Sequence, residues 1–214
     1  MPPRSIKHRG GLQWATQRGQ LLGRLGRPLG PEDRAEFPTA KALTFAYVRI
    51  GFAVPKSLGI TSMTLDQWRS IYAGEVNNWS QLGGPDKTIV RLGRKPTESV
   101  FRTIVYSYPN FINSTFATTL DKDDQMVKAI SRTPGSIGFS DRLGLAKHPE
   151  VQILEIEGFE CLLEVGLVYD ETNADNPALQ QIMDFVRSDH WHDMLVANPQ
   201  MAPPDAWHEN SLLK

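Results

Sequence analysis

The stretch from Ala42 to Val54 constrains the fold more than any other part of the sequence. It reads as a long β-strand, because apolar side chains alternate along it with the period of two that a pleated strand requires. The alternation changes phase near Tyr47 and Val48, so the apolar residues before and after this point lie on opposite faces of the strand. Either a bulge or a change of sheet is expected there. A strand that changes its buried face midway is what a crossing between two lobes requires.

The length of the chain allows two lobes, and its composition is that of a globular protein. The 214 residues exceed the commonest domain size of about 100–150 residues, so one large domain and two small lobes are both open. Apolar residues make up 40% and charged residues 22%, which excludes a collagen, a coiled coil and a wholly disordered chain. The apolar run at 42–54 contains Thr44 and Arg49 and is shorter than the roughly 18–20 residues that a transmembrane helix needs.

Charge is balanced overall but uneven along the chain. The net charge of −1 gives no electrostatic reason to expect a nucleic-acid partner. Residues 1–34 hold seven Lys or Arg and two Asp or Glu, a balance of +5, and the remainder carries −6. This basic start fits either an arm that attracts anions or an ordinary exposed terminus. It does not read as a signal peptide, because residues 12–18 are not an apolar run.

Residue types that form metal sites and recurrent enzyme motifs are sparse. Cys161 is the single cysteine, so neither an intrachain disulfide nor a cysteine zinc site can form. His190 and His192 are two positions apart, and on a helix such positions point in different directions. The recurrent nucleotide-binding, hydrolase and metalloprotease motifs are absent. We therefore expect neither a metal nor a cofactor.

Helix and strand signals alternate along the chain. The clearest helix follows Thr64, which can cap it together with Gln67, and the helix ends at Gly74. Apolar spacing and proline placement predict further helices, and β-branched and aromatic runs predict strands. These helices are expected at 98–107, at 124–132 and from Pro177 onward, and the strands at 42–54, 88–92, 136–139, 151–156 and 162–169. The alternation predicts a mostly parallel α/β arrangement.

A strand that leads directly into a helix forms the candidate binding site. After Leu92 come a glycine, the cations Arg94 and Lys95, and the hydroxyl groups of Thr97 and Ser99. Free backbone N–H groups and the helix dipole favour an anion at such a place, and the carboxyl end of a strand is where open α/β sheets bind ligands. The structural alternative is that Thr97 caps the helix and that Arg94 and Lys95 are solvated.

Several motifs occur in an order that is typical of one family. Residues 64–79 form a helix and a turn, residues 89–94 follow as a strand that ends in Gly-Arg, and residues 26–33 and 127–139 add further matches. The matching positions of the first segment are Leu65, Ile71, Tyr72, Gly74, Val76 and Trp79. Together these segments resemble the phosphate-binding protein family of ABC transporters, over roughly residues 10 to 200.

The resemblance implies a two-lobed, type II periplasmic-binding-protein-like fold that closes by a hinge on a small ligand. This is an α/β fold with mixed sheets and crossing hinge strands. The first lobe is expected at 1–51 and 161–214, incomplete because an initial strand–helix unit is missing, and the second lobe at 52–160. The ligand contacts that the resemblance implies are Arg94, Thr97, Ser99, Arg27 and Gly11.

The helix start departs from the family pattern. The family has Ser-Gly-Thr there, whereas this chain has Glu98 at the serine position and Val100 at the threonine position. A carboxylate at Glu98 repels a bound anion, which argues against phosphate. A shift of one residue would instead bring Ser99 into the serine position.

Arg27 is a second departure. Tight phosphate binders often have an aspartate in this region, so Arg27 is expected to donate to a fully ionised or carboxylate ligand. The structural alternative is an ion pair between Arg27 and either Glu32 or Asp33.

The resemblance favours a solute-binding protein that captures a small anion between its lobes for an ABC transporter permease. The ligand is phosphate, another oxyanion or a carboxylate, and the protein is expected to be monomeric and periplasmic or extracellular. If Met1 is the true start, the absence of an export signal makes it cytoplasmic. The alternative is a degenerate relative that acts as a ligand-sensing or protein-interaction module. No enzyme is expected, since Glu98, Asp141 and His148 follow no recognised catalytic spacing.

Overall fold

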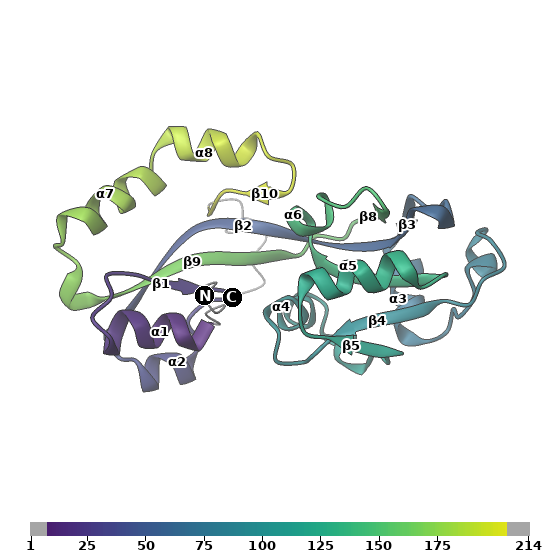
Figure 1. Ribbon diagram of the computed structural model, residues 1–214, viewed down its shortest axis with the longest axis horizontal. Helices are drawn as coiled ribbons and strands as arrows, with labels where there is room; N and C mark the ends of the chain where they lie inside the picture. The colour runs from purple at the N-terminus through teal and green to yellow at the C-terminus, as the bar shows by residue number, and fades with distance from the viewer. Residues whose placement is uncertain (1–7, 205–214) are drawn as a thin grey trace. The chain divides into compact units, whose positions relative to one another are not determined.

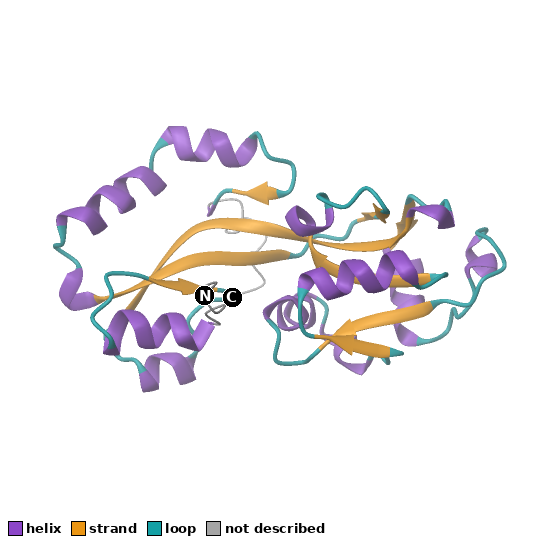
Figure 2. Cartoon of the chain, viewed as in Figure 1, coloured by secondary structure: helices purple, strands orange, loops and turns teal. Residues whose placement is uncertain are grey.

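The structure, a computed structural model, describes residues 8–204. The chain divides into two units, one that runs up to Val48 and resumes at Leu163, and one that spans Arg49–Leu162. The first unit is therefore built from two separate stretches of sequence and the second from one. Figure 1 labels most of the helices and strands of both units, and Figure 2 shows which segments are helix, strand or loop.

Helices and strands are distributed over the whole described chain. The α-helices are α1 (His8–Gln17), α2 (Pro31–Glu36), α3 (Leu65–Ala73), α4 (Ser99–Ser107), α5 (Asp123–Arg132), α6 (Arg142–Leu145), α7 (Pro177–Val186) and α8 (Asp189–Val196). The strands are β1 (Gly23–Leu25), β2 (Ala40–Pro55), β3 (Ser62–Thr64), β4 (Val90–Arg94), β5 (Thr118–Leu120), β6 (Ser136–Asp141), β7 (Val151–Ile153), β8 (Glu155–Glu157), β9 (Leu162–Asp170) and β10 (Met201–Ala202). Short 3-10 helices include η2 (Trp79–Leu82) and η3 (Pro109–Asn113).

Strand β2 is the long strand that the apolar pattern predicts. It is continuous over 16 residues. Its partners change along its length, since β10 pairs with it at Tyr47 and Val48, and β6 pairs with it from Ile50 to Ala53. The change of partner follows directly after the predicted change of phase. One strand thus takes part in the sheet of the first unit and then in that of the second.

In the first unit, β9 lies between β1 and β2 in the sheet, and β10 also pairs with β2. The pairs β1–β9 and β10–β2 are antiparallel. Helix α1 packs on β1 and places Leu12 against Leu25 in one buried cluster. Helix α7 places Leu179 and Met183 against Leu43 of β2 in another. Two small apolar clusters therefore hold α1 and α7 to the sheet of this unit.

In the second unit, β4 lies between β5 and β6 and runs parallel to both. Helix α5 packs along these three strands, of which Figure 1 labels β4 and β5. Strand β3 pairs in parallel with β8 in a separate small sheet. Strand β6 is antiparallel to β2, as is β7. The prediction of a mostly parallel arrangement is therefore wrong, because β2 is antiparallel to β6, β7 and β10, and β1 is antiparallel to β9. The mixed α/β sheets that the resemblance implies are confirmed.

Aromatic rings fill the core of the second unit. Phe52 of β2 is fully buried, and its ring centroid lies between 5.2 and 5.4 Å from those of four other rings. These four residues are Trp68, Tyr72, Phe139 and Phe159. Such ring pairs stabilise a core beyond the area that they bury, so Phe52 joins β2 to helix α3 and to strand β6.

Helix α3 begins and ends where the sequence predicts. The Thr64 hydroxyl accepts a hydrogen bond from the Gln67 backbone N–H at 3.2 Å, and the Gln67 side chain accepts one from the Thr64 backbone N–H at 2.9 Å. Gly74 follows with a φ of 81°, in the left-handed region that favours glycine. Downstream, the Trp79 indole donates to the Gly135 carbonyl at 2.9 Å, so two motifs that lie far apart in the sequence are in contact. Within the described part of the chain, none of the helices has the length and apolar character that a membrane crossing requires.

Candidate functional site

The strand–loop–helix segment that the sequence singles out lies in the second unit. Strand β4 ends at Arg94, residues 95–98 form the loop, and α4 begins at Ser99. Strand β6, parallel to β4, ends at Asp141, and helix α5 begins at Asp123. The carboxyl ends of parallel strands and the helix starts that follow them share one edge of a sheet, and open α/β sheets bind their ligands there. We call this place the β4–β6 edge.

Arg94 is the buried cation at the β4–β6 edge. Its side chain is 4% exposed, with Nη1 3.1 Å from Oδ1 of Asp123 and Nη2 3.8 Å from Oε2 of Glu98. Within the described residues, its Nε and Nη1 atoms are buried and make no hydrogen bond. A guanidinium has five N–H donors. Arg94 therefore has unused donors although two carboxylates lie beside it.

Two residues at the end of β6 add to the edge. Ser140 is fully buried, and its hydroxyl donates to Oδ1 of Asp123 at 2.6 Å. Asp141 caps α6 by accepting a hydrogen bond from the Gly144 backbone N–H at 2.7 Å. Burial raises the pKa of Asp141, and the charge of nearby Asp123 raises it further, against the hydrogen bond from Gly144 that lowers it. The end of β6 thus places a hydroxyl group and a second carboxylate close to Asp123.

The start of α4 differs from the structural alternative, in which Thr97 caps this helix. Glu98 is the N-cap residue of α4, so the prediction that Thr97 caps this helix is wrong. Thr97 is exposed in the loop, whereas Ser99 is partly buried as the first residue of α4. Lys95 is exposed and pairs with Asp121 at 2.9 Å. The side chains of Arg94 and Ser99 therefore belong to the β4–β6 edge, and that of Thr97 to the loop surface.

Two residues of this edge, Asp123 and Ser140, are not among the ligand contacts predicted from the sequence. Asp123 lies one position before the helix expected from residue 124, and Ser140 one position after the strand expected to end at residue 139. A signal for both existed, because polar residues just after a parallel strand and at the start of the next helix lie at the ligand-binding edge.

Arg27 and Gly11 lie in the first unit. Nη1 of Arg27 donates to Oδ2 of Asp33 at 2.5 Å, and Nη2 donates to Oδ1 at 3.0 Å. This bidentate contact is the ion pair with Asp33 that the structural alternative predicts. Gly11 lies in α1, where a Cβ atom would come within 2.0 Å of the Arg24 carbonyl oxygen. The lack of a side chain at Gly11 therefore serves the packing of α1 on β1.

We expect the Arg27–Asp33 pair to make the first unit sensitive to acid. Burial raises the pKa of Asp33, but hydrogen bonds from Arg27 and Gly30 and the charges of His8 and Arg27 outweigh it, so the pKa lies below its usual 3.8. A carboxylate whose pKa falls on folding stabilises the protein above its unfolded-state pKa, and this stabilisation is lost as the pH drops through the folded-state value. Asp33→Asn should therefore unfold more easily than the parent at about pH 6, with a difference that shrinks below about pH 4.

Urea unfolding followed by circular dichroism checks this expectation. Glu32→Gln is the matched control, since Glu32 is an exposed carboxylate one position away, and it should leave stability nearly unchanged. A difference between Asp33→Asn and the parent that stays constant across the pH range would contradict the role given to Asp33.

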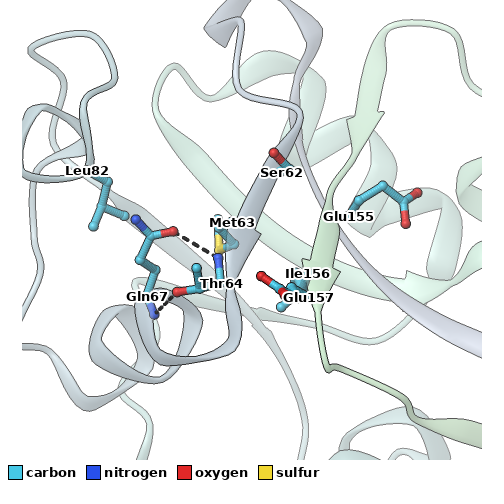
Figure 3. Close-up of a pocket in the computed structure, with 8 residues that line it drawn as sticks. All are labelled: Ser62, Met63, Thr64, Gln67, Leu82, Glu155, Ile156 and Glu157. Carbon is cyan, nitrogen blue, oxygen red and sulfur yellow. Dashed lines mark hydrogen bonds between the residues drawn. The ribbon is translucent and has the colours of Figure 1, made fainter.

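Two hollows in the second unit are less suited to an anion. One, of about 480 Å³, lies beside the β3–β8 pair and is shown in Figure 3. Glu155 and Glu157 line it, and Thr64 and Gln67 of the same lining already hydrogen-bond each other. The other, of about 260 Å³, lies between α3 and η3, and its lining includes the rings of Trp68, Tyr72, Tyr108 and Phe111. Neither lining includes Arg94, so the β4–β6 edge remains the candidate anion site.

The fold is that of a periplasmic-binding-protein-like domain, and the chain belongs to the PBP superfamily. Residues 26–154 match the model of the PBP superfamily domain. Among curated relatives, the phosphate-binding protein PstS of Borreliella burgdorferi is 31% identical over 168 residues, which cover 73% of this chain and 58% of that protein. PstS of Bacillus subtilis is 30% identical over 103 residues, which cover 47% of this chain and 34% of that protein. The chain thus spans less than two thirds of the length of either relative.

A solved structure has the same fold. It is a Clostridium perfringens protein described as a phosphate ABC transporter substrate-binding protein with bound phosphate. The TM-score is 0.66 and the sequence identity 19%, over 92% of this chain and 85% of that chain. At this identity the likeness establishes the fold and not the ligand. The phosphate-binding-protein-like fold that the resemblance implies is confirmed.

Proposed function

We propose that the protein is a solute-binding protein that captures a small anion for an ABC transporter, with Arg94 as the main contact of the anion. The observation that carries the proposal is a guanidinium that is 4% exposed and keeps unused donors at the carboxyl end of a parallel strand. Buried donors without an acceptor are costly, and a ligand that accepts from them removes that cost. Ser99 and the first N–H groups of α4 add donors at the same edge. The names of the relatives support a small anionic ligand.

The remaining predicted contacts are weaker candidates. Thr97 can approach a ligand only from the loop surface. Arg27 already uses both terminal nitrogens on Asp33, and Gly11 has a packing role in α1. Arg94 and Ser99 are therefore the residues on which the proposal depends.

Isothermal titration calorimetry of the full chain with phosphate, sulfate, molybdate and short carboxylates tests the proposal. We expect heat with at least one of these anions. Arg94→Gln should weaken binding by about tenfold to a hundredfold, the usual size of a hydrogen bond to a charged group. Arg102→Gln is the control, because Arg102 is an exposed cation on α4, the helix that follows Arg94 in the sequence. No heat with any small solute would overturn the proposal.

One observation favours a second function, that of a ligand-sensing or protein-interaction module without transport. Arg94 already lies within ion-pair distance of Glu98 and Asp123, so its charge is matched inside the protein. If no small solute binds, while substitutions on the surface abolish the capture of a protein partner, this function replaces the first.

The first proposal carries further expectations. A transport protein of this kind works outside the cytoplasmic membrane as a monomer, delivers its ligand to a permease, and catalyses no reaction. Its proposed lobes are residues 1–51 with 161–214 and residues 52–160. Fractionation of the source cells and light scattering of the purified protein check the location and the monomeric state.

A further inference from the structure

The charges around Arg94 do not suit a doubly charged oxyanion. Carboxylate oxygens of Asp123 and Glu98 lie 3.1 and 3.8 Å from its guanidinium nitrogens. Asp141 is near enough to Asp123 for the two charges to interact. The Arg94 guanidinium therefore already has two carboxylates beside it, one of which has a further carboxylate nearby, and phosphate would enlarge this excess of negative charge.

The excess of carboxylates is not arranged as a metal site. Among residues 8–204, no three His, Cys, Asp or Glu side chains form a group that could hold a metal ion. Asp123 is 52% exposed, and the buried Ser140 hydroxyl donates to one of its oxygens. An oriented carboxylate that solvent can reach is a suitable acceptor for the N–H groups of an organic cation.

Donors for an anionic group lie at the same edge. The Nε and Nη1 atoms of Arg94 are buried and make no hydrogen bond within the described residues. Helix α4 has nine residues and begins at Ser99. Its first backbone N–H groups and the Ser99 hydroxyl are therefore further donors for an anionic group. The edge thus offers donors for an anionic group next to an acceptor for a cationic one.

We propose that the β4–β6 edge binds a small zwitterion with a carboxylate and an ammonium group on neighbouring atoms, the chemistry of a free α-amino acid. The carboxylate binds Arg94 and the start of α4, and the ammonium group binds Asp123. Such a ligand satisfies the donors of Arg94 without adding net charge. Glu98 and Asp123 then select against phosphate. This inference rests on the proposed function, of which it names the ligand class.

Calorimetry on the full chain separates the two proposals. The common L-amino acids are titrated one at a time, and the tightest is compared with the acid that lacks its amine, the amine that lacks its carboxylate, and inorganic phosphate. We expect at least one amino acid to bind about tenfold or more tightly than each of these three probes. If phosphate or the bare acid binds as tightly, the proposed function stands and the zwitterion is wrong. If nothing binds, both are wrong.

Asp123→Asn tests the role of the carboxylate directly. It should weaken amino-acid binding by about tenfold or more and leave the bare acid unchanged or tighter, since only the amino acid places a cation on Asp123. Asp124→Asn is the matched control, because Asp124 is an exposed residue in the same first turn of α5 and the change in net charge is the same. A purely structural role for Asp123 would weaken both ligands alike, and that result would overturn the assignment.

Discussion

Replacing Phe52 with alanine should lower the free energy of unfolding by about 3–5 kcal/mol, the usual cost of removing a large buried aromatic side chain. Phe52 is fully buried, and four other rings lie with their centroids within 5.4 Å of its own. These rings come from a helix, a neighbouring strand and a loop, so they cannot all move in to fill the space that the substitution leaves. The cavity that remains adds to the lost transfer free energy. Denaturant unfolding, followed by tryptophan fluorescence and circular dichroism together, measures the change.

Two further variants make this result interpretable. Phe52→Leu keeps most of the apolar volume and should cost clearly less than the alanine variant. Tyr106→Ala removes a ring of α4 that is 50% exposed and should change stability by less than about 0.5 kcal/mol. If Phe52→Ala costs no more than Tyr106→Ala, the ring cluster is not the centre of this core.

Substitution of Gly11 by valine should disrupt the first unit. A Cβ atom at Gly11 would lie 2.0 Å from the Arg24 carbonyl oxygen and 2.8 Å from the Arg24 nitrogen. Both atoms are backbone atoms of β1, so no side chain can rotate away, and α1 has to separate from the strand. We expect a loss of about 3 kcal/mol or more, at or above the upper end of overpacking costs. Hydrogen exchange of the backbone amides in α1 and β1 should rise accordingly.

Gln17→Ala provides the control, because Gln17 is exposed at the end of the same helix and should tolerate alanine. Gly23→Ala is a second test of the same contact, since a Cβ atom at Gly23 would lie 2.0 Å from the Gly11 carbonyl oxygen. If Gly11→Val leaves folding intact but removes solute binding, the ligand role expected for Gly11 is supported instead of the packing role.

Elements that carry their own local signals could be predicted from the sequence. Helix α3 has a capping box at Thr64 and Gln67 and a left-handed glycine at its end, and both lie within a few residues of the helix that they define. Strand β2 is long enough for its alternation, and the change in that alternation, to be seen. Arg94 could be placed at the end of a strand before a helix because the strand, the loop and the helix are consecutive.

Features that depend on distant residues could not be predicted in the same way. Helix α1 contains a pair of glycines and little apolar surface, so its place on β1 follows from a close backbone contact and not from its own propensity. The pairing of Arg94 with Asp123 joins the end of one strand to the start of a later helix, and only the parallel alignment of β4 and β5 brings them together. The antiparallel direction of β2 against β6 likewise depends on topology and not on local pattern.

Because the first unit is made of two separate stretches of sequence, its two portions leave the ribosome at different times. The second unit, Arg49–Leu162, is one uninterrupted segment and can complete its sheet while synthesis continues. The early part of β2 has to wait for β9 and β10, which follow the second unit in the sequence. During synthesis this half of β2 therefore has exposed backbone groups, and an mRNA truncated after the second unit would yield a chain with one folded unit and an unpaired strand end prone to aggregation.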